Sequence, residues 1–154
     1  MKKVKIGELL NAEQALEQVI DGQNDIAAVT KFKFLQVKRK LEEYSKDYET
    51  VRTDCIRKYG TQQENGDYIL KAPIKEDYVV EVVDDETKEF FDADKFEEDT
   101  KKFEEAIKSF NNALNEVVNK EVEIDKKDLF RPDDLFNKGI PSRVIEGLMP
   151  VITL

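Results

Sequence analysis

Side chains that could act as nucleophiles, bases or zinc ligands are scarce in this chain of 154 residues. The sequence has no histidine and a single cysteine, Cys55. A cysteine nucleophile needs a neighbouring base, and zinc sites are built mostly from cysteine and histidine. The sequence therefore excludes Cys–His catalysis, the common zinc sites and an internal disulfide, which fits a reducing compartment. We interpret Cys55 as a small core residue.

Acidic clusters are the remaining candidates for chemistry. Carboxylates can bind metal ions, and two clusters have the composition for it, Asp84-Asp85-Glu86 and Asp92-Ala93-Asp94. Neither fits the calcium loop of an EF-hand, and the scattered glycines match no phosphate-binding loop. We interpret the clusters as solvated acidic turns. The sequence predicts no catalytic residue, no metal and no cofactor, and hence a protein that is not an enzyme.

Charge is unevenly distributed along the chain. The formal net charge of −9 argues against nucleic acid or an anionic membrane as a partner, because phosphates attract lysine and arginine. Residues 25–60 carry nine Lys and Arg against six Asp and Glu, whereas residues 61–105 carry six against sixteen. Two interpretations stay open. The two segments neutralise each other within the fold, or the acidic segment binds a basic partner.

The basic run from Lys31 to Lys40 has a pattern that nucleic-acid-binding surfaces share. Phe32 and Phe34 alternate with lysines there, as aromatic side chains do on surfaces that stack against bases. Phe34 also begins an apolar ladder and is expected to be buried. We therefore interpret the run as the basic face of a helix, opposite an apolar seam.

Two apolar ladders with alternating steps of three and four residues indicate long helices. This spacing keeps a narrow apolar seam on one side of a helix, as in coiled coils. We predict helices over residues 25–60 and 94–119 that pair as an antiparallel hairpin, with Leu41 and Ile107 buried between them. The ladders consist of Phe34, Val37, Leu41, Tyr44, Tyr48, Val51 and Cys55, and of Phe103, Ile107, Phe110, Leu114 and Val117.

Short alternating segments predict a small sheet at the base of this hairpin. Residues 3–6 and 121–125 each contain two β-branched residues spaced by one polar residue. The two long helices bring these segments to one end, so Val4 and Ile6 should pair with the segment Val122–Ile124.

A second β-hairpin is predicted at the tip, over residues 68–83. We favour pairing of Tyr68–Leu70 with Val79–Val82 across the loop that contains Pro73. The dipeptide Asn65-Gly66 could turn a tight hairpin of its own, but Gln62-Gln63 makes a poor preceding strand.

Capping signals predict where the helices begin. Asn11 with Gln14, and Asp94 with Glu97, have the spacing of capping boxes, which places a short helix at 12–20 and the start of the second long helix. Asn24 or Asp25 should cap the first long helix, which should end at Tyr59. A last helix at 141–149 should begin at Ile140-Pro141 and carry an apolar face.

These elements together predict an α+β fold, mainly α, in one elongated domain over residues 1–154. Its main feature is a long, coiled-coil-like antiparallel helical hairpin. A small β-sheet lies at the base, which comprises residues 1–24 and 120–154, and a β-hairpin lies at the tip, within residues 61–91.

Three motifs are found within residues 4–70, Lys31-Phe32-Lys33-Phe34-Leu35, Arg57-Lys58-Tyr59-Gly60 and Glu64-Asn65-Gly66-Asp67. Over these residues the chain resembles a family of small uncharacterised proteins of tailed phages and prophages. It implies a phage origin and expression alongside virion or host-takeover genes. It implies no catalytic residue.

A function based on shape and charge is what these observations predict. We expect a non-enzymatic phage protein that acts through protein–protein contacts, as a structural or assembly component of the virion. The alternative is an acidic inhibitor of a host defence or nucleic-acid-binding protein. Either would act in the host cytoplasm or the virion, without a membrane or direct nucleic-acid contact, with a protein partner or as a homo-oligomer. The candidate interaction residues are the acidic Asp84, Asp85, Glu86 and Asp92 and the apolar Val144, Leu148 and Met149.

Overall fold

The computed structural model describes residues 1–22, 27–83 and 87–153. It is mainly helical with small antiparallel sheets, as an α+β fold that is mainly α should be. The chain forms two compact units: Met1–Thr50 together with Asn115–Leu154 (unit 1), and Val51–Leu114 (unit 2). The expectation of one elongated domain stays a prediction.

Unit 1 begins with the predicted base sheet. Strand β1 (Lys2–Lys5) pairs antiparallel with β6 (Glu121–Ile124), with Val4 opposite Val122. Ile6 already belongs to helix α1 (Ile6–Asp21), but its backbone N–H still donates to the carbonyl of Lys120 at 3.0 Å. The pairing of Val4 with the Val122–Ile124 segment is therefore confirmed, and that of Ile6 is wrong because Ile6 starts the helix.

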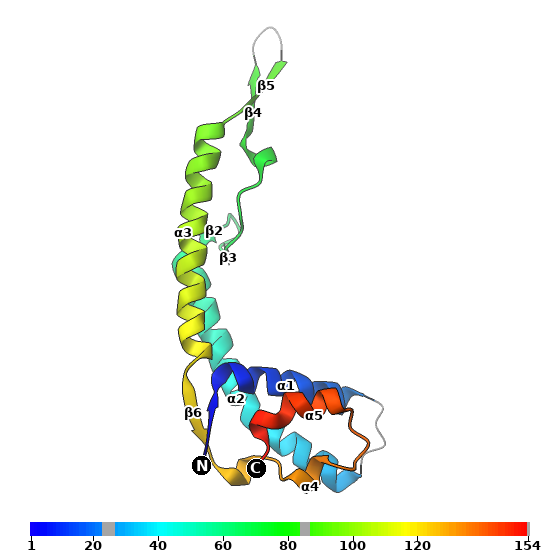
Figure 1. The fold of residues 1–154 in the computed structure, drawn as a ribbon. Coiled ribbons are helices and arrows are strands. Elements are labelled where there is room, and N and C mark those ends of the chain that lie inside the picture. The colour runs from blue at the N-terminus through cyan, green and yellow to red at the C-terminus, as the bar shows by residue number, and fades with distance from the viewer. Residues whose placement is uncertain (23–26, 84–86, 154) are drawn as a thin grey trace. The chain divides into compact units, whose positions relative to one another are not determined.

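The rest of unit 1 is built from helices and short turns. It contains the first part of α2 (Ala28–Tyr59) and the last turn of α3 (Ala93–Val118). After β6 the chain continues through η2 (Lys126–Asp128), α4 (Pro132–Leu135), α5 (Ser142–Leu148) and η3 (Met149–Val151). Figure 1 shows α5 lying along α1.

The hydrophobic core belongs to unit 1. One face of α1 is fully buried in it, at Leu9, Ala12, Leu16 and Val19. Helix α5 approaches α1 so closely that a Cβ on Gly147 would lie 2.9 Å from the Cβ of Ala15. The ring of Phe34 on α2 meets that of Phe130 edge to face, with centroids 5.4 Å apart. Burial of large apolar side chains at this density is the main source of stability.

The predicted start of the first helix is wrong, although its apolar face is confirmed. Helix α1 begins at Ile6, and Asn11 lies inside it. Its N-terminus is instead capped by Glu8 of its own first turn, because a carboxylate oxygen of Glu8 accepts a hydrogen bond from the backbone N–H of Lys5 at 3.1 Å. Asn24 and Asp25, the predicted caps of the next helix, lie outside the described residues. The predicted end of that helix at Tyr59 is confirmed.

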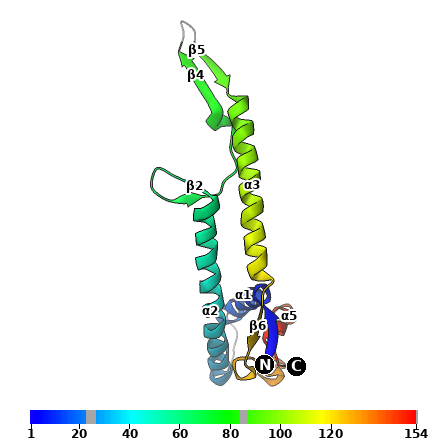
Figure 2. The same ribbon diagram turned by 90° about the vertical axis from the view of Figure 1, so that its left-hand side faces the viewer.

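Unit 2 contains two β-hairpins between the end of α2 and the start of α3 (Figure 2). The first pairs β2 (Thr61–Gln62) with β3 (Tyr68–Ile69). After η1 (Lys75–Tyr78), the second pairs β4 (Val79–Val83) with β5 (Thr87–Phe91).

The predicted hairpin over residues 68–83 is therefore wrong, since Tyr68–Ile69 and Val79–Val83 belong to different hairpins. The turn at Asn65-Gly66 closes the first one. Gly66 has a φ of +90°, and the side chain of Asn65 accepts the N–H of Asp67 at 3.0 Å. This local bonding sets the turn even though two glutamines precede it, because turn chemistry outweighs weak strand propensity over so short a pairing.

Gly60 lets the first hairpin sit directly on the end of α2. A Cβ at this position would lie 2.5 Å from the carbonyl oxygen of Ile56 and 2.7 Å from that of Ile69. Only glycine fits between these two backbone atoms.

Helix α3 begins at Ala93, and Asp92 caps it. The Asp92 carboxylate accepts the backbone N–H of Lys95 at 3.1 Å. The predicted capping box of Asp94 and Glu97 is thus wrong, because Asp94 already lies in the first turn.

The long antiparallel helical hairpin is not confirmed. On the first ladder, Phe34, Val37 and Leu41 are buried in the unit 1 core, whereas Val51 is 37% exposed. Ile107, on the second ladder, is only partly buried. Apolar residues at alternating steps of three and four also suit a helix that covers a globular core, and this is how α2 uses the first half of its ladder.

Candidate functional site

The predicted acidic interaction residues are only partly within the described chain. Asp84, Asp85 and Glu86 lie outside it. Asp92 is partly buried, and one of its carboxylate oxygens holds the N-terminus of α3. Asp92 therefore has a structural role in the helix cap.

The predicted apolar interaction face at the C-terminus is largely covered by the core of unit 1. Val144 and Leu148 are buried in the unit 1 core, where α5 packs on α1. Met149 follows them in sequence and is exposed. An amphipathic helix looks the same in sequence whether its apolar face meets the core or a partner, and here the core covers it.

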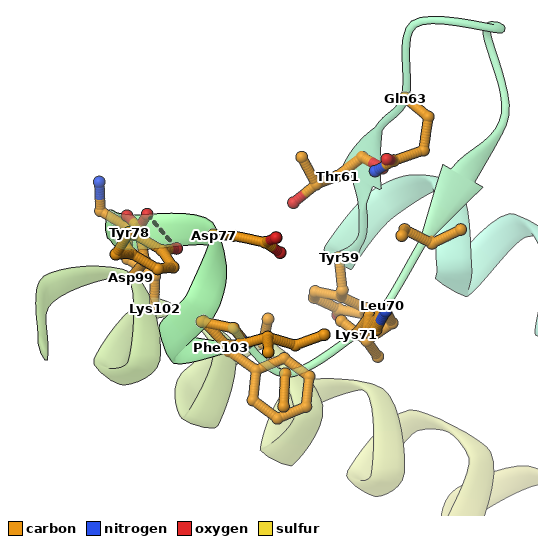
Figure 3. A pocket seen from close by; sticks show the side chains of 15 residues that line it. Tyr59, Thr61, Gln63, Leu70, Lys71, Asp77, Tyr78, Asp99, Lys102 and Phe103 are labelled. Carbon is orange, nitrogen blue, oxygen red and sulfur yellow. Dashed lines mark hydrogen bonds between the residues drawn. The ribbon is translucent and has the colours of Figure 1, made fainter. Parts of the chain in front are cut away.

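Unit 2 has a groove of about 400 Å³ between α3 and the segment that joins β3 to η1. Figure 3 shows Phe103 on α3 at one side of it, Tyr59 and Leu70 close together at another, and Asp77 pointing toward the open space. The groove mixes apolar and charged side chains. Among its described lining residues there is no cysteine or histidine.

Tyr78 and Asp99 hold η1 on α3 beside this groove. The Tyr78 hydroxyl donates to a carboxylate oxygen of Asp99 at 2.7 Å, the bond dashed in Figure 3. This bond, followed by burial, raises the pKa of Tyr78 to about 12, because phenolate would lose the bond and face the Asp99 charge. The ring also packs edge-on against Phe96, with centroids 5.3 Å apart. Tyr78 thus stays protonated at neutral pH and keeps its hydrogen bond to Asp99.

A small acidic depression of about 300 Å³ lies beside the hydrogen bond between Tyr78 and Asp99. Its carboxylates come from Asp77, Asp92 and Asp99, and Lys95 is the only cation among the residues described as lining it. Val80 also lines the depression, so an apolar side chain lies beside the three carboxylates. We call Asp77, Asp92 and Asp99 the acidic depression.

The β4–β5 hairpin beside this depression exposes apolar side chains on both faces. Val79 pairs with Phe91, and Val80 pairs with Phe90. Phe91 leans on Phe96 of α3, with ring centroids 5.7 Å apart. Val80 and Phe90 are 52% and 61% exposed. Neighbouring residues of a strand point to opposite faces, so the second pair forms an apolar patch that the described chain leaves open.

Unit 1 carries a groove of opposite charge, of about 830 Å³. Its cations are Lys33 from α2, Lys126 and Lys127 from η2, and Arg131, and Asp134 is the one carboxylate among the described lining residues. We call the four cations the basic groove. Val29 and Phe32, both strongly exposed, line the same groove.

The basic groove is not neutralised within the described part of the chain. Lys33 donates to the backbone carbonyl of Lys127 at 3.3 Å, which places its ammonium over η2. None of the four cations forms an ion pair with a described carboxylate. Sequence reasoning missed this groove because Lys33 and Lys127 are 94 positions apart. The burial of Phe34 was predicted correctly, while Phe32 points outward, 59% exposed.

In the residues that the structure describes, no group of three or more His, Cys, Asp or Glu side chains is arranged to hold a metal ion. No helix in the same residues combines the length and apolarity needed to cross a bilayer.

Comparisons with protein-family models, with curated proteins and with solved structures found no match to this chain.

Proposed function

We propose that this protein is a non-enzymatic phage protein that acts through protein–protein contacts, as an assembly or structural component of the virion. The observation that carries the proposal is the exposed apolar patch of Val80 and Phe90 on a two-stranded hairpin. The phage origin comes from the sequence resemblance.

The physical argument begins with the stability of unit 2. Among its described residues only Leu114 is buried, with 9% of its surface exposed, so this unit has little core of its own. A two-stranded hairpin is at best marginally stable in water without packing on a further surface. Both outer edges of the β4–β5 sheet also lack a strand partner in the described chain, and such edges readily pair with another chain.

A partner that covers the patch would supply the missing burial. Fully burying a valine or phenylalanine side chain stabilises by about 1.5–3 kcal/mol. Val80 and Phe90 are each more than half exposed, so each has a large part of that free energy still to gain. This gain favours a lasting complex over a transient encounter.

The proposal retains the antiparallel pairing of α2 and α3. The partly buried Phe103, Ile107 and Phe110 on α3 are compatible with a helix that packs along one side. The protein would work in the host cytoplasm during assembly and remain in the virion.

The test is to measure the protein in purified particles from infected cells. We expect a copy number related to the symmetry of the particle, and loss of the protein from particles in the variant Val80→Thr/Phe90→Thr. Threonine keeps β-propensity while it removes apolar surface. Phe136→Thr, at another exposed phenylalanine, is the matched control and should be incorporated normally.

The alternative role gives a different result in the same cells. An inhibitor would be expressed early, would be absent from particles, and would be recovered by pull-down with one host protein. That outcome would overturn the virion proposal.

A further inference from the structure

We infer that the basic groove of one copy binds the acidic depression and the adjoining apolar patch of a second copy. This inference rests on the proposed function, because it names the partner in assembly as the protein itself. The residues that carry it are Lys126, Lys127 and Arg131 on one side and Asp77 and Val80 on the other.

Charge is the first argument for this occupant. Among the described lining residues, four cations and the carboxylate of Asp134 leave the basic groove with an excess of three positive charges. Counted in the same way over the described chain, three carboxylates and Lys95 leave the acidic depression with an excess of two negative charges. A protein with a net charge of −9 gains nothing in solubility from an unpaired basic groove, but opposite potentials steer two copies together.

The apolar side chains provide a second, independent match. The basic groove is lined by the exposed Val29 and Phe32, and the acidic depression is flanked by the exposed Val80 and Phe90. Each surface thus combines uncompensated charge with uncovered apolar area. Interfaces between proteins have this composition, with aromatic anchors in the centre and charges around them.

Nucleic acid is the other occupant that a basic groove with an exposed phenylalanine could take. The rest of the molecule disfavours it. Sixteen acidic residues lie between positions 61 and 105, and their field repels phosphates. The same field attracts the basic groove of another copy.

The two surfaces are different, so the contact between copies is heterologous. Such contacts generate a ring if the rotation closes, and a filament if it does not. Both results are suitable for a component of a particle built from repeated subunits.

Complementary charge reversal tests the inference on the full chain. The groove variant is Lys126→Glu/Lys127→Glu/Arg131→Glu. The second variant, the depression variant, reverses exposed carboxylates in and next to the acidic depression, Glu76→Lys/Asp77→Lys/Asp94→Lys. These six side chains make no hydrogen bond or ion pair within the described chain, so the fold should persist. Circular dichroism checks this before association is measured.

Sedimentation velocity provides the readout. We expect the wild-type protein to self-associate at low salt, and each variant to weaken that association at least about tenfold, since like charges then face each other. An equimolar mixture of the two variants should form a 1:1 complex, because one copy retains an intact groove and the other an intact depression. Lys3→Glu/Lys5→Glu/Lys46→Glu, with the same change in net charge outside the groove, should associate like wild type.

Three results would overturn the inference. The first is a wild-type protein that stays monomeric at low salt, and the second is a mixture of the two variants that forms no complex. The third is tight binding of a labelled single-stranded oligonucleotide that the groove variant loses. A monomeric free protein that is nevertheless incorporated into particles would overturn self-association and leave the proposed function standing.

Discussion

Leu41 and Val51 lie on the same apolar ladder of α2, but the structure predicts very different costs for replacing them by alanine. Leu41 is 2% exposed in the unit 1 core, and Val51 is 37% exposed. A continuous coiled-coil seam would bury both. The pair of variants therefore separates a helix that covers a globular core from a helix paired along its whole length.

The magnitudes follow from the atoms removed. Leu41→Ala deletes three buried carbons, which at about 0.8 kcal/mol each amounts to about 2.4 kcal/mol of lost transfer free energy. The cavity left in a tightly packed core brings the total to about 3–4 kcal/mol. Val51→Ala deletes two partly exposed carbons, worth about 1 kcal/mol. Alanine regains about 0.5 kcal/mol in helix propensity, so the net cost is about 0.5 kcal/mol.

Urea unfolding followed by circular dichroism measures both costs. Hydrogen exchange of the amides in α1 then locates the loss, because α1 shares its core with Leu41 and lies in unit 1. Equal losses of free energy of unfolding in the two variants would refute our reasoning and restore the coiled-coil seam. A loss below about 1 kcal/mol for Leu41→Ala would show that its site is not tightly packed.

Three further outcomes follow from the structure. Asp92→Ala should cost about 1 kcal/mol and speed hydrogen exchange in the first turn of α3, because it removes the helix cap; unchanged exchange there would contradict the cap. Ultraviolet titration should show one tyrosine that ionises at about pH 12, and this ionisation should be absent in Tyr78→Phe. The stability that comes from the hydrogen bond of Tyr78 to Asp99 should be complete below pH about 10 and be lost as the pH rises through 12. A titration that is identical in both proteins would exclude this hydrogen bond. Leu148→Asp should unfold unit 1 while Met149→Asp leaves it folded, as circular dichroism can show, since only Leu148 is in the core; a folded Leu148→Asp variant would mean that α5 does not pack as described.

Several elements were predictable because short-range chemistry decides them. The spacing of Ala12, Leu16 and Val19 is enough to define a helix with one apolar face, and that face is buried. The end of α2 at Tyr59 and the pairing of Val4 with the Val122–Ile124 segment were also predicted correctly. In each case the residues that decide the outcome are close in sequence or are short β-branched segments without a competing partner.

Errors arose where two local signals competed. Asn65-Gly66 turns a hairpin despite the glutamines before it, which releases β4 to pair with β5. Helix α3 takes Asp92 and not Asp94 as its cap, because the helix extends back as far as a side chain can satisfy its free N–H groups.

The sequence by itself determined the helices, the base sheet, the lack of histidine and the excess of negative charge. Tertiary structure alone decided which apolar residues became core and which stayed open to a partner. Leu148 and Phe90 are both apolar residues in regular elements, yet α1 covers the first while no described element covers the second. Tertiary structure also assembled the basic groove, because it brought Lys33 next to Lys127 of η2, which lies 94 positions away in sequence. Periodicity reports which side of an element is apolar, but only packing between distant segments determines what that side meets.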